Sequence, residues 1–164
     1  MAVALAMLGC RHLPSADDIP PAIPPGAVVR VDGVDINYRL LEATEAAAAA
    51  RPVVVMLHGF GASSATWLDV EDELRRVAPL LQIDLKGFGY SEKPEGDDYS
   101  VDDQVRMVLG VLRHLDVRDI VLLGHSFGGG VALRALFTLR DSVTDLAVHR
   151  LVLLDAASYD QKMP

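Results

Sequence analysis

The stretch Ile120-Val-Leu-Leu-Gly-His-Ser-Phe-Gly-Gly-Gly130 decides how this chain folds. It begins with an apolar run of strand length and contains a serine between two glycines, in the pattern Gly-X-Ser-X-Gly over residues 124–128. A strand that turns sharply into a helix lifts this serine, Ser126, above the carboxyl edge of a sheet. Gly124, His125 and Gly128 form the elbow around it, and the two glycines have no side chains to collide across the bend. The stretch therefore predicts a strand, a strained turn at Ser126 and a helix.

The residues around Ser126 supply what a nucleophilic hydroxyl needs. The following helix directs its positive end at the serine, and the backbone N–H of Phe127 can hold developing oxyanion charge. A second donor is the N–H of Phe60 in His58-Gly-Phe-Gly61, which follows another apolar run. We interpret His58 as a residue that shapes this turn. A small-residue turn with an incidental serine is the competing interpretation, and the flanking strand and helix disfavour it.

Short, nearly continuous apolar runs are typical of strands buried on both faces of a parallel sheet. The chain has them at residues 53–57, 80–85, 120–123 and 151–154. Helical patterns separate the runs at residues 64–77, 100–115 and 127–139. The second helical pattern opens with Ser100-Val-Asp-Asp103, which is close to a capping box. This order predicts an α/β fold, a three-layer sandwich with a mostly parallel sheet and right-handed crossovers.

An antiparallel hairpin is predicted ahead of the parallel strands. Residues 28–39 alternate in polarity around Asp32-Gly33, and Asp-Gly suits a two-residue turn in which both residues have positive φ. The Ala-rich segment at 42–51 is too short for a stable isolated helix, so we predict a loop or one loose turn there. The chain has no internal repeat.

Composition excludes several other classes of protein. The chain has 164 residues, of which 51% are hydrophobic, which is enough for one core and too much for a disordered chain. Its 15 basic and 23 acidic residues give a net charge of −8, which argues against nucleic-acid binding. No apolar run approaches the roughly 20 residues that span a bilayer. Because Cys10 is the single cysteine, a disulfide framework and a cysteine-rich zinc site are excluded.

Residues 1–26 are predicted to form a signal-like, proline-rich tail, and the domain is predicted to begin at residue 27. Met7-Leu-Gly-Cys10 resembles the lipidation box of a bacterial lipoprotein, although no basic residue precedes its apolar stretch. A frayed tail with an incidental cysteine fits equally well. The five prolines at 14–26 favour an extended tether. The location therefore stays open between the cell envelope, with a lipid anchor at Cys10, and the cytoplasm.

Four segments together resemble the amino-terminal half of an α/β-hydrolase-fold enzyme of the small esterase type. In chain order they are His58–Trp67, Asp84–Ser91, Gly124–Gly129 and Leu151–Asp155. The resemblance covers residues 28–164 and implies that Ser126 is the nucleophile. It also implies an oxyanion hole made of the N–H groups of Phe60 and Phe127, and a shaping role for residues 84–91.

The family's triad places its acid and then its histidine after the serine, and in this sequence residues 127–164 follow Ser126. The one histidine among them, His149, is expected at the sheet edge opposite the serine. The other histidines are not credible bases, because they are expected in the tail, on a helix surface or facing away from the serine; they are His12, His114 and His125. Asp155 ends a strand at the correct edge, and we favour a structural role for it over that of the catalytic acid.

The resemblance implies a serine hydrolase that cleaves an ester or similar acyl substrate through an acyl-enzyme, with no metal or organic cofactor. The chain ends about where the family's cap and last strands begin, so residues 27–164 are expected to be an incomplete domain that is inactive alone. Its apolar edge strand, 151–154, would then be exposed, and a complementing chain could supply the missing strands. The alternative is a non-catalytic binding or regulatory remnant of the same fold. Reaction of Ser126 with an organophosphonate separates the two.

Overall fold

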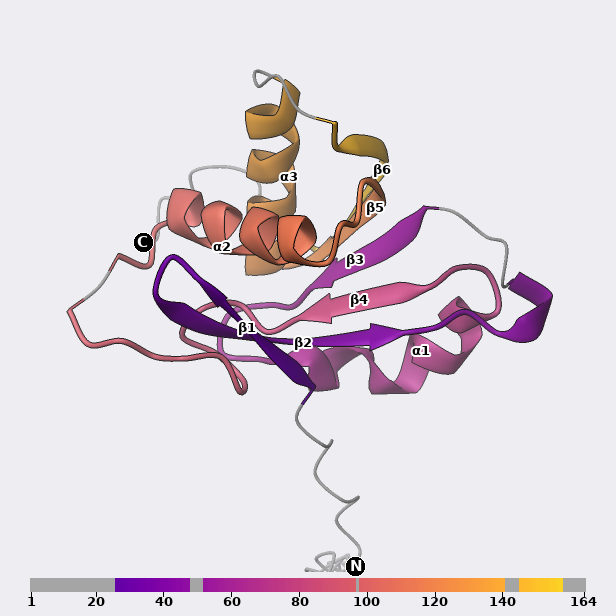
Figure 1. The fold of residues 1–164 in the computed structure, drawn as a ribbon, viewed down its shortest axis with the longest axis horizontal. Coiled ribbons are helices and arrows are strands. Elements are labelled where there is room, and N and C mark those ends of the chain that lie inside the picture. Colours follow the sequence, from indigo (N-terminus) through magenta and orange to yellow (C-terminus); the bar gives the residue numbers. More distant parts are fainter. Residues whose placement is uncertain (1–25, 48–51, 97, 141–144, 158–164) are drawn as a thin grey trace, which may run out of the picture.

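The computed structural model describes residues 26–47, 52–96, 98–140 and 145–157. Its centre is a six-stranded sheet with the strand order β1-β2-β4-β3-β5-β6 (Figure 1). The strands are β1 (Ala27–Val31), β2 (Val34–Leu41), β3 (Val53–Leu57), β4 (Leu80–Ile83), β5 (Asp119–His125) and β6 (Ala147–Leu154). The predicted tail with Cys10 lies outside the described residues, as do residues 158–164.

The strand directions confirm the predicted hairpin and the mostly parallel sheet. β1 pairs with β2, and β2 with β4, in antiparallel fashion, whereas β3 pairs with β4 and β5, and β5 with β6, in parallel. The hairpin turn consists of Asp32 and Gly33, whose φ angles are 49° and 88°. Both residues therefore have the left-handed backbone that a two-residue hairpin turn requires.

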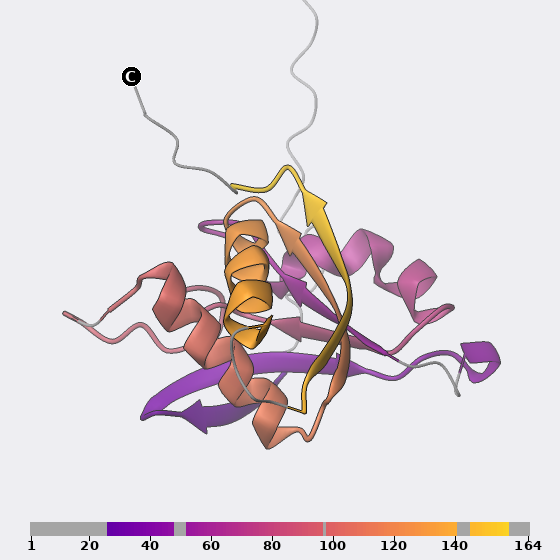
Figure 2. The same cartoon turned by 90° about the horizontal axis from the view of Figure 1, so that it is seen from above.

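Helices cover both faces of the sheet, which confirms the three-layer sandwich. α2 (Val101–His114) and α3 (Phe127–Arg140) lie on one face, and α1 (Leu68–Arg75) lies on the other (Figure 1 and Figure 2). In α2 the apolar side chains recur at helical spacing and are buried against the sheet. The side chain of Ser100 accepts a hydrogen bond from the N–H of Asp103 and caps this helix, as its sequence predicts.

The central strands bury both of their faces, which explains their continuous apolar sequences. In β3, Val55 and Leu57 belong to the larger core under α2 and α3. Met56, between them, belongs to a smaller core on the α1 side that also contains Trp67. The carboxyl ends of β3, β4 and β5 thus form one edge of a sheet that is anchored from both sides.

Two details differ from the sequence predictions, and a third agrees with its prediction. The helix that the periodicity predicts over residues 64–77 is a 3-10 turn, η3 (Ser64–Trp67), followed by α1, which ends at Arg75. The Ala-rich segment contains a single 3-10 turn, η2 (Glu45–Ala47), in agreement with the prediction of one loose turn. The strand predicted at 151–154 begins at Ala147 instead. It lies at the edge of the described sheet, so Val152, Leu153 and Leu154 are exposed, as expected for an apolar edge strand and unlike the runs that are buried on both faces.

Candidate functional site

Ser126 lies in the turn between the last residue of β5 and the first residue of α3. Its φ angle is 51°, in the left-handed region that a residue with a side chain rarely adopts. The turn is tied to the end of β6, because the N–H of Ser126 donates to the carbonyl oxygen of Leu154 over 2.9 Å. The carbonyl oxygen of Ser126 in turn accepts hydrogen bonds from the N–H groups of Gly129 and Ala157. The surrounding backbone therefore holds Ser126 in a conformation that costs about 1–3 kcal/mol.

The two glycines of the motif permit a very close approach of backbones. A Cβ atom on Gly128 would lie 2.3 Å from the carbonyl oxygen of Leu57, the last residue of β3. A Cβ atom on Gly124 would lie 2.4 Å from the carbonyl oxygen of Gly128. Real Cβ atoms do not come so near to backbone atoms, so no larger residue fits at either position. The start of α3 consequently lies directly on the end of β3.

The loop that follows β3 lies against Ser126. A Cβ atom on Gly59 would stand 3.3 Å from the Cβ of Ser126, and the ring centroids of Phe60 and Phe127 are 6.1 Å apart. Among the described residues, no protein acceptor takes the backbone N–H of Phe60 or of Phe127. The structure thus brings together Ser126, Phe60 and Phe127, the three residues that sequence analysis assigned to one site.

His58 shapes this loop from inside the protein. The N–H of Leu85 donates to its Nε2 over 3.0 Å, so Nδ1 carries the proton and donates to the carbonyl oxygen of Gly59 over 2.8 Å. Burial lowers the pKa of His58, although the hydrogen bond to Gly59 and the nearby Asp84 oppose this effect. The ring is therefore neutral and joins the loop after β3 to the segment after β4, in agreement with the predicted turn-shaping role.

The carboxylate of Asp84 is a second buried link between these segments. Its Oδ1 accepts the N–H of Ser64 over 2.6 Å, and its Oδ2 accepts the N–H of Tyr90 and the side-chain amide of Asn37. Gly89 lies so close that a Cβ atom there would be 2.2 Å from Oδ2. These hydrogen bonds are the means by which residues 84–91 shape the neighbouring loops, which is the role predicted for them.

Lys86 and Asp103 form a buried ion pair that sequence analysis missed. The Nζ of Lys86 lies 2.7 Å from Oδ2 of Asp103, and both side chains are almost completely excluded from solvent. The predicted capping box is therefore only half formed, because the Asp103 carboxylate pairs with Lys86 and Arg106. A lysine beside a glycine turn and an acid in a first helical turn are ordinary surface patterns, so neither residue signals burial by itself.

An aromatic cavity of about 310 Å³, called the cavity beside Ser126 below, is lined by Phe127, the residue that follows Ser126 in the chain. Its lining residues come from the loops after β3 and β4, from α2 with the segment before it, and from the start of α3; they are Phe60, Gly87, Phe88, Tyr99, Gln104 and Phe127. The rings of Phe60, Phe88 and Phe127 contact one another at centroid distances of 5.2–6.3 Å. The site therefore combines a partly exposed turn serine, two backbone N–H groups without an acceptor among the described residues, and an apolar recess.

The described histidines do not add a general base to this site. His149 lies 2.9 Å from Asp119, the first residue of β5, at the end of the strand opposite Ser126. His114 is the exposed last residue of α2. The Nδ1 atom of His125 is buried, has no hydrogen-bond partner among the described residues, and faces Gly59.

Asp155 follows β6 at the same sheet edge as Ser126. It is exposed, its φ angle is 44°, and no described residue forms a hydrogen bond or ion pair with its carboxylate. Without a histidine to orient, its role as an acid stays a prediction, as does the structural role that we favour.

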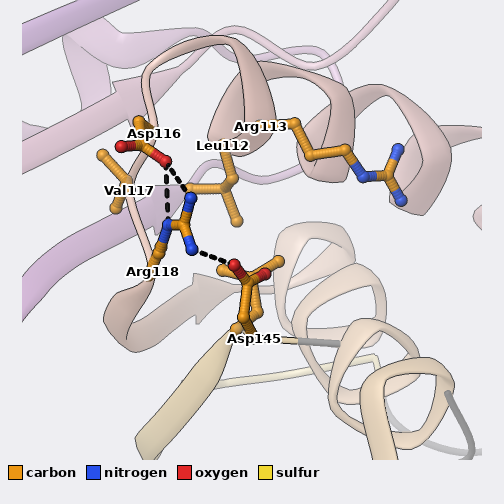
Figure 3. A pocket seen from close by; sticks show the side chains of 7 residues that line it. Leu112, Arg113, Asp116, Val117, Arg118 and Asp145 are labelled. Atoms are coloured by element: carbon orange, nitrogen blue, oxygen red, sulfur yellow. Dashed lines mark hydrogen bonds and ion pairs between the residues drawn. The ribbon is translucent and has the colours of Figure 1, made fainter. Parts of the chain in front are cut away.

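A second cavity, of about 170 Å³, lies at the opposite end of the sheet (Figure 3). There Arg118 forms ion pairs with Asp116 and Asp145. The hydrogen bonds that the guanidinium donates to these two carboxylates, together with their negative charges, raise its pKa. The carbonyl oxygen of Arg118 also accepts the N–H of Ala147, at the start of β6. Since the opposite charges are paired, we assign this cluster to joining β5 and β6.

The described residues contain no cluster of three or more His, Cys, Asp or Glu side chains that could hold a metal ion. No helix in this part of the chain has the length and apolar character needed to cross a membrane.

Known proteins with similar sequences include several hydrolases. A family model described as the alpha/beta hydrolase fold matches residues 52–164. An uncharacterized hydrolase of Bacillus subtilis (strain 168) is 34% identical over 114 residues, which cover 70% of this chain and 40% of that protein. The 2-hydroxymuconate semialdehyde hydrolase of Pseudomonas sp. (strain CF600) is 36% identical over 107 residues, which cover 63% of this chain and 36% of that protein.

Solved structures of hydrolases have a similar fold. A variant of the meta-cleavage product hydrolase of Pseudomonas fluorescens IP01 has a TM-score of 0.71 and 26% identity, over 84% of this chain and 47% of that one. An esterase of Exiguobacterium antarcticum has a TM-score of 0.68 and 27% identity, over 81% of this chain and 46% of that one. The chain spans less than half the length of each of these four relatives.

Proposed function

Because the chain belongs to the alpha/beta hydrolase fold family, we propose that it is a serine hydrolase that cleaves an ester or similar acyl substrate through Ser126. Relatives named as hydrolases support hydrolysis as the general activity. The observation that carries the proposal is the left-handed backbone of Ser126 at a strand-to-helix turn, with the loop 58–61 against it. Strained residues of this kind persist where the structure around them enforces the conformation, and they cluster at active sites.

The proposed reaction has two steps. Ser126 Oγ attacks the substrate's carbonyl carbon and its proton passes to a base, which delivers it to the leaving oxygen as the carbon–oxygen bond breaks. The N–H groups of Phe60 and Phe127 hold the negative oxygen of the tetrahedral intermediate. Water then attacks the acyl-enzyme, which releases the carboxylic acid and restores the serine hydroxyl.

The base in this proposal is a histidine from further sequence or from a complementing chain. Among the described residues, His58 uses both ring nitrogens in structural hydrogen bonds, and His149 lies at the far end of β5. We accordingly expect residues 1–164 to be inactive alone. Activity should be assayed in the complete product of the gene that contains this sequence, called the full-length protein below.

Hydrolysis of 4-nitrophenyl acetate and butyrate by the full-length protein tests the proposal. We expect Ser126→Ala to lower kcat by about 10³-fold or more, because the nucleophile is removed while the oxyanion donors stay. Thr138→Ala is the matched control, since it removes a hydroxyl of α3 that donates to the carbonyl oxygen of Arg134 and lies outside the proposed site. Ser126→Ala with the wild-type rate would contradict the proposal.

A non-catalytic binding role is the second candidate, and the lack of a general base among the described residues favours it. In that case the full-length protein would hydrolyse neither ester, and Ser126 would stay inert toward an organophosphonate. Hydrolysis that depends on Ser126 excludes this role.

A further inference from the structure

We propose that the cavity beside Ser126 binds the acyl part of the substrate and selects acyl groups that carry an uncharged aromatic ring. This inference rests on the proposed function and names the substrate class of the same site. Four observations carry it: the lining of the cavity, its lack of charge, its size, and its position relative to Ser126.

The lining is built to contact a flat apolar group. Four aromatic side chains surround the cavity, and Phe60 is 78% exposed although it is large and apolar. Its ring meets those of Phe88 and Phe127 at steep angles of 69° and 87°, so the three rings form walls and not a flat stack. A further ring between these walls would bury Phe60 and gain edge-to-face contacts.

The lining has no free charge. The Nζ of Lys86 lies 5.1 Å from the centroid of the Tyr99 ring, and it is buried and paired with Asp103. The side chain of Gln104 is buried and donates its amide N–H to the carbonyl oxygen of Lys86, and its Oε1 has no hydrogen-bond partner among the described residues. An anionic acyl group would therefore lose hydration without gaining a partner, because an amide oxygen accepts hydrogen bonds and does not donate them.

The size of the cavity sets a limit on the acyl group. An apolar cavity of roughly 150 Å³ accommodates benzene. The cavity beside Ser126 has about twice that volume, 310 Å³, which leaves room for a ring and a short linker to the carbonyl carbon. Phenylacetyl and similar arylalkanoyl groups fit this limit.

The position of the cavity assigns it to the acyl part and not to the leaving alcohol. Phe60 and Phe127 contribute both cavity walls and the proposed oxyanion donors, so the cavity begins at the substrate's carbonyl group. A leaving oxygen must meet a general acid as the bond breaks. The lining contains no histidine or carboxylate, and the hydroxyl of Tyr99 already donates to the carbonyl oxygen of Pro94.

The test compares 4-nitrophenyl esters that share one leaving group: acetate, phenylacetate and the anionic hemisuccinate. For the full-length protein we expect kcat/KM to be about tenfold higher for the phenylacetate than for the acetate. The kcat/KM for the hemisuccinate should be lower than both values. Tyr99→Ala should reduce the phenylacetate-to-acetate ratio severalfold, and Tyr99→Leu, which keeps an apolar side chain of similar bulk, should reduce it less. Phe137→Ala, an exposed aromatic of α3 outside the cavity, should leave the ratio unchanged.

The outcomes separate this inference from the proposed function. Hydrolysis that requires Ser126 but favours acetate, or a ratio that Tyr99→Ala does not alter, overturns the inference and leaves the proposed function standing. A second series with one acyl group and varied alcohols serves as a check. If Tyr99→Ala changes the preference among alcohols and not among acyl groups, the acyl assignment is wrong. If Ser126→Ala hydrolyses every ester like the wild type, the proposed function is wrong and the inference falls with it.

Discussion

The ammonium group of Lys86 lies 2.7 Å from the carboxylate of Asp103, in the interior of the protein. Lys86 belongs to the segment after β4, and Asp103 belongs to the first turn of α2. The same ammonium donates to the carbonyl oxygen of Asp98. The pair therefore fixes one wall of the aromatic cavity, because Gly87 and Tyr99 lie beside these residues in the chain and line it.

Replacing Lys86 by methionine should destabilise the protein strongly. The variant leaves the Asp103 carboxylate buried with an incomplete set of partners, which typically costs about 3–5 kcal/mol of unfolding free energy. Urea denaturation followed by circular dichroism measures the loss. The matched control is Arg30→Met, which removes a cation from an exposed ion pair with Asp35 and should cost less than about 1 kcal/mol.

The double variant Lys86→Met with Asp103→Leu tests the reason for that loss. If an unpaired buried charge causes it, removing the second charge should recover most of the stability. A double variant as unstable as Lys86→Met alone would show that the ion pair itself, or its packing, is required.

The glycine at position 128 should not tolerate even alanine. The added Cβ would lie 2.3 Å and 2.4 Å from the carbonyl oxygens of Leu57 and His58, so the start of α3 would have to move away from β3. We expect Gly128→Ala to lower the melting temperature and to cost about 1–3 kcal/mol or more. Gly33→Ala is the comparison, because its Cβ meets no atom and only its φ of 88° is unfavourable. Equal losses would contradict a steric cause at Gly128.

The free energy of unfolding should decrease as the pH is lowered, because His58 is buried. Burial lowers its pKa in the folded protein below the value of 6.5 that the unfolded chain retains, so below pH 6.5 the unfolded state binds the extra proton first. This contribution is complete above pH 6.5 and is lost as the pH falls toward the lowered pKa. Unfolding free energies at about pH 5 and about pH 7.5 measure it. His58→Gln should flatten this pH dependence, and the exposed control His114→Gln should not; the reverse result would contradict the burial effect.

Asp155→Asn separates the two roles considered for this carboxylate. Asparagine tolerates the positive φ of 44° at this position, so the turn after β6 should be preserved. With a structural role, kcat of the full-length protein should stay within about threefold of the wild type, whereas losing a catalytic acid costs about 10⁴-fold. The larger loss would overturn the structural role that we favour.

Most of the fold could be predicted from local patterns. The runs at 53–57 and 120–123 read as buried strands because both faces of β3 and β5 are covered by helices. Asp32-Gly33 specified the hairpin through its backbone preference. The edge position expected for residues 151–154 followed from the family resemblance and not from the apolar run, because such a run does not reveal whether another strand pairs with it. The 3-10 turn at the start of the predicted 64–77 helix could not be predicted from the periodicity either, since a 3-10 turn keeps a similar spacing of apolar residues.

The site was predictable only where a tight turn restricts the sequence. Ser126, Phe60 and Phe127 could be named because glycines mark the two turns that hold them. The Lys86–Asp103 pair, the hydrogen bonds of Asp84 and the aromatic cavity depend on contacts between segments far apart in the chain. Periodicity in a sequence predicts single helices and strands. It does not predict which side chains from different loops will contact one another.

Reaction of Ser126 with a fluorophosphonate is the most direct test of the central claim. The full-length protein is incubated with the probe and digested, and the peptide containing residues 120–130 is analysed by mass spectrometry. We predict a phosphonyl adduct on Ser126 that forms in the wild type and in Thr138→Ala and is absent from Ser126→Ala. A full-length protein that hydrolyses esters while Ser126 stays unmodified, or that neither hydrolyses them nor reacts, would contradict the assignment of Ser126 as the nucleophile.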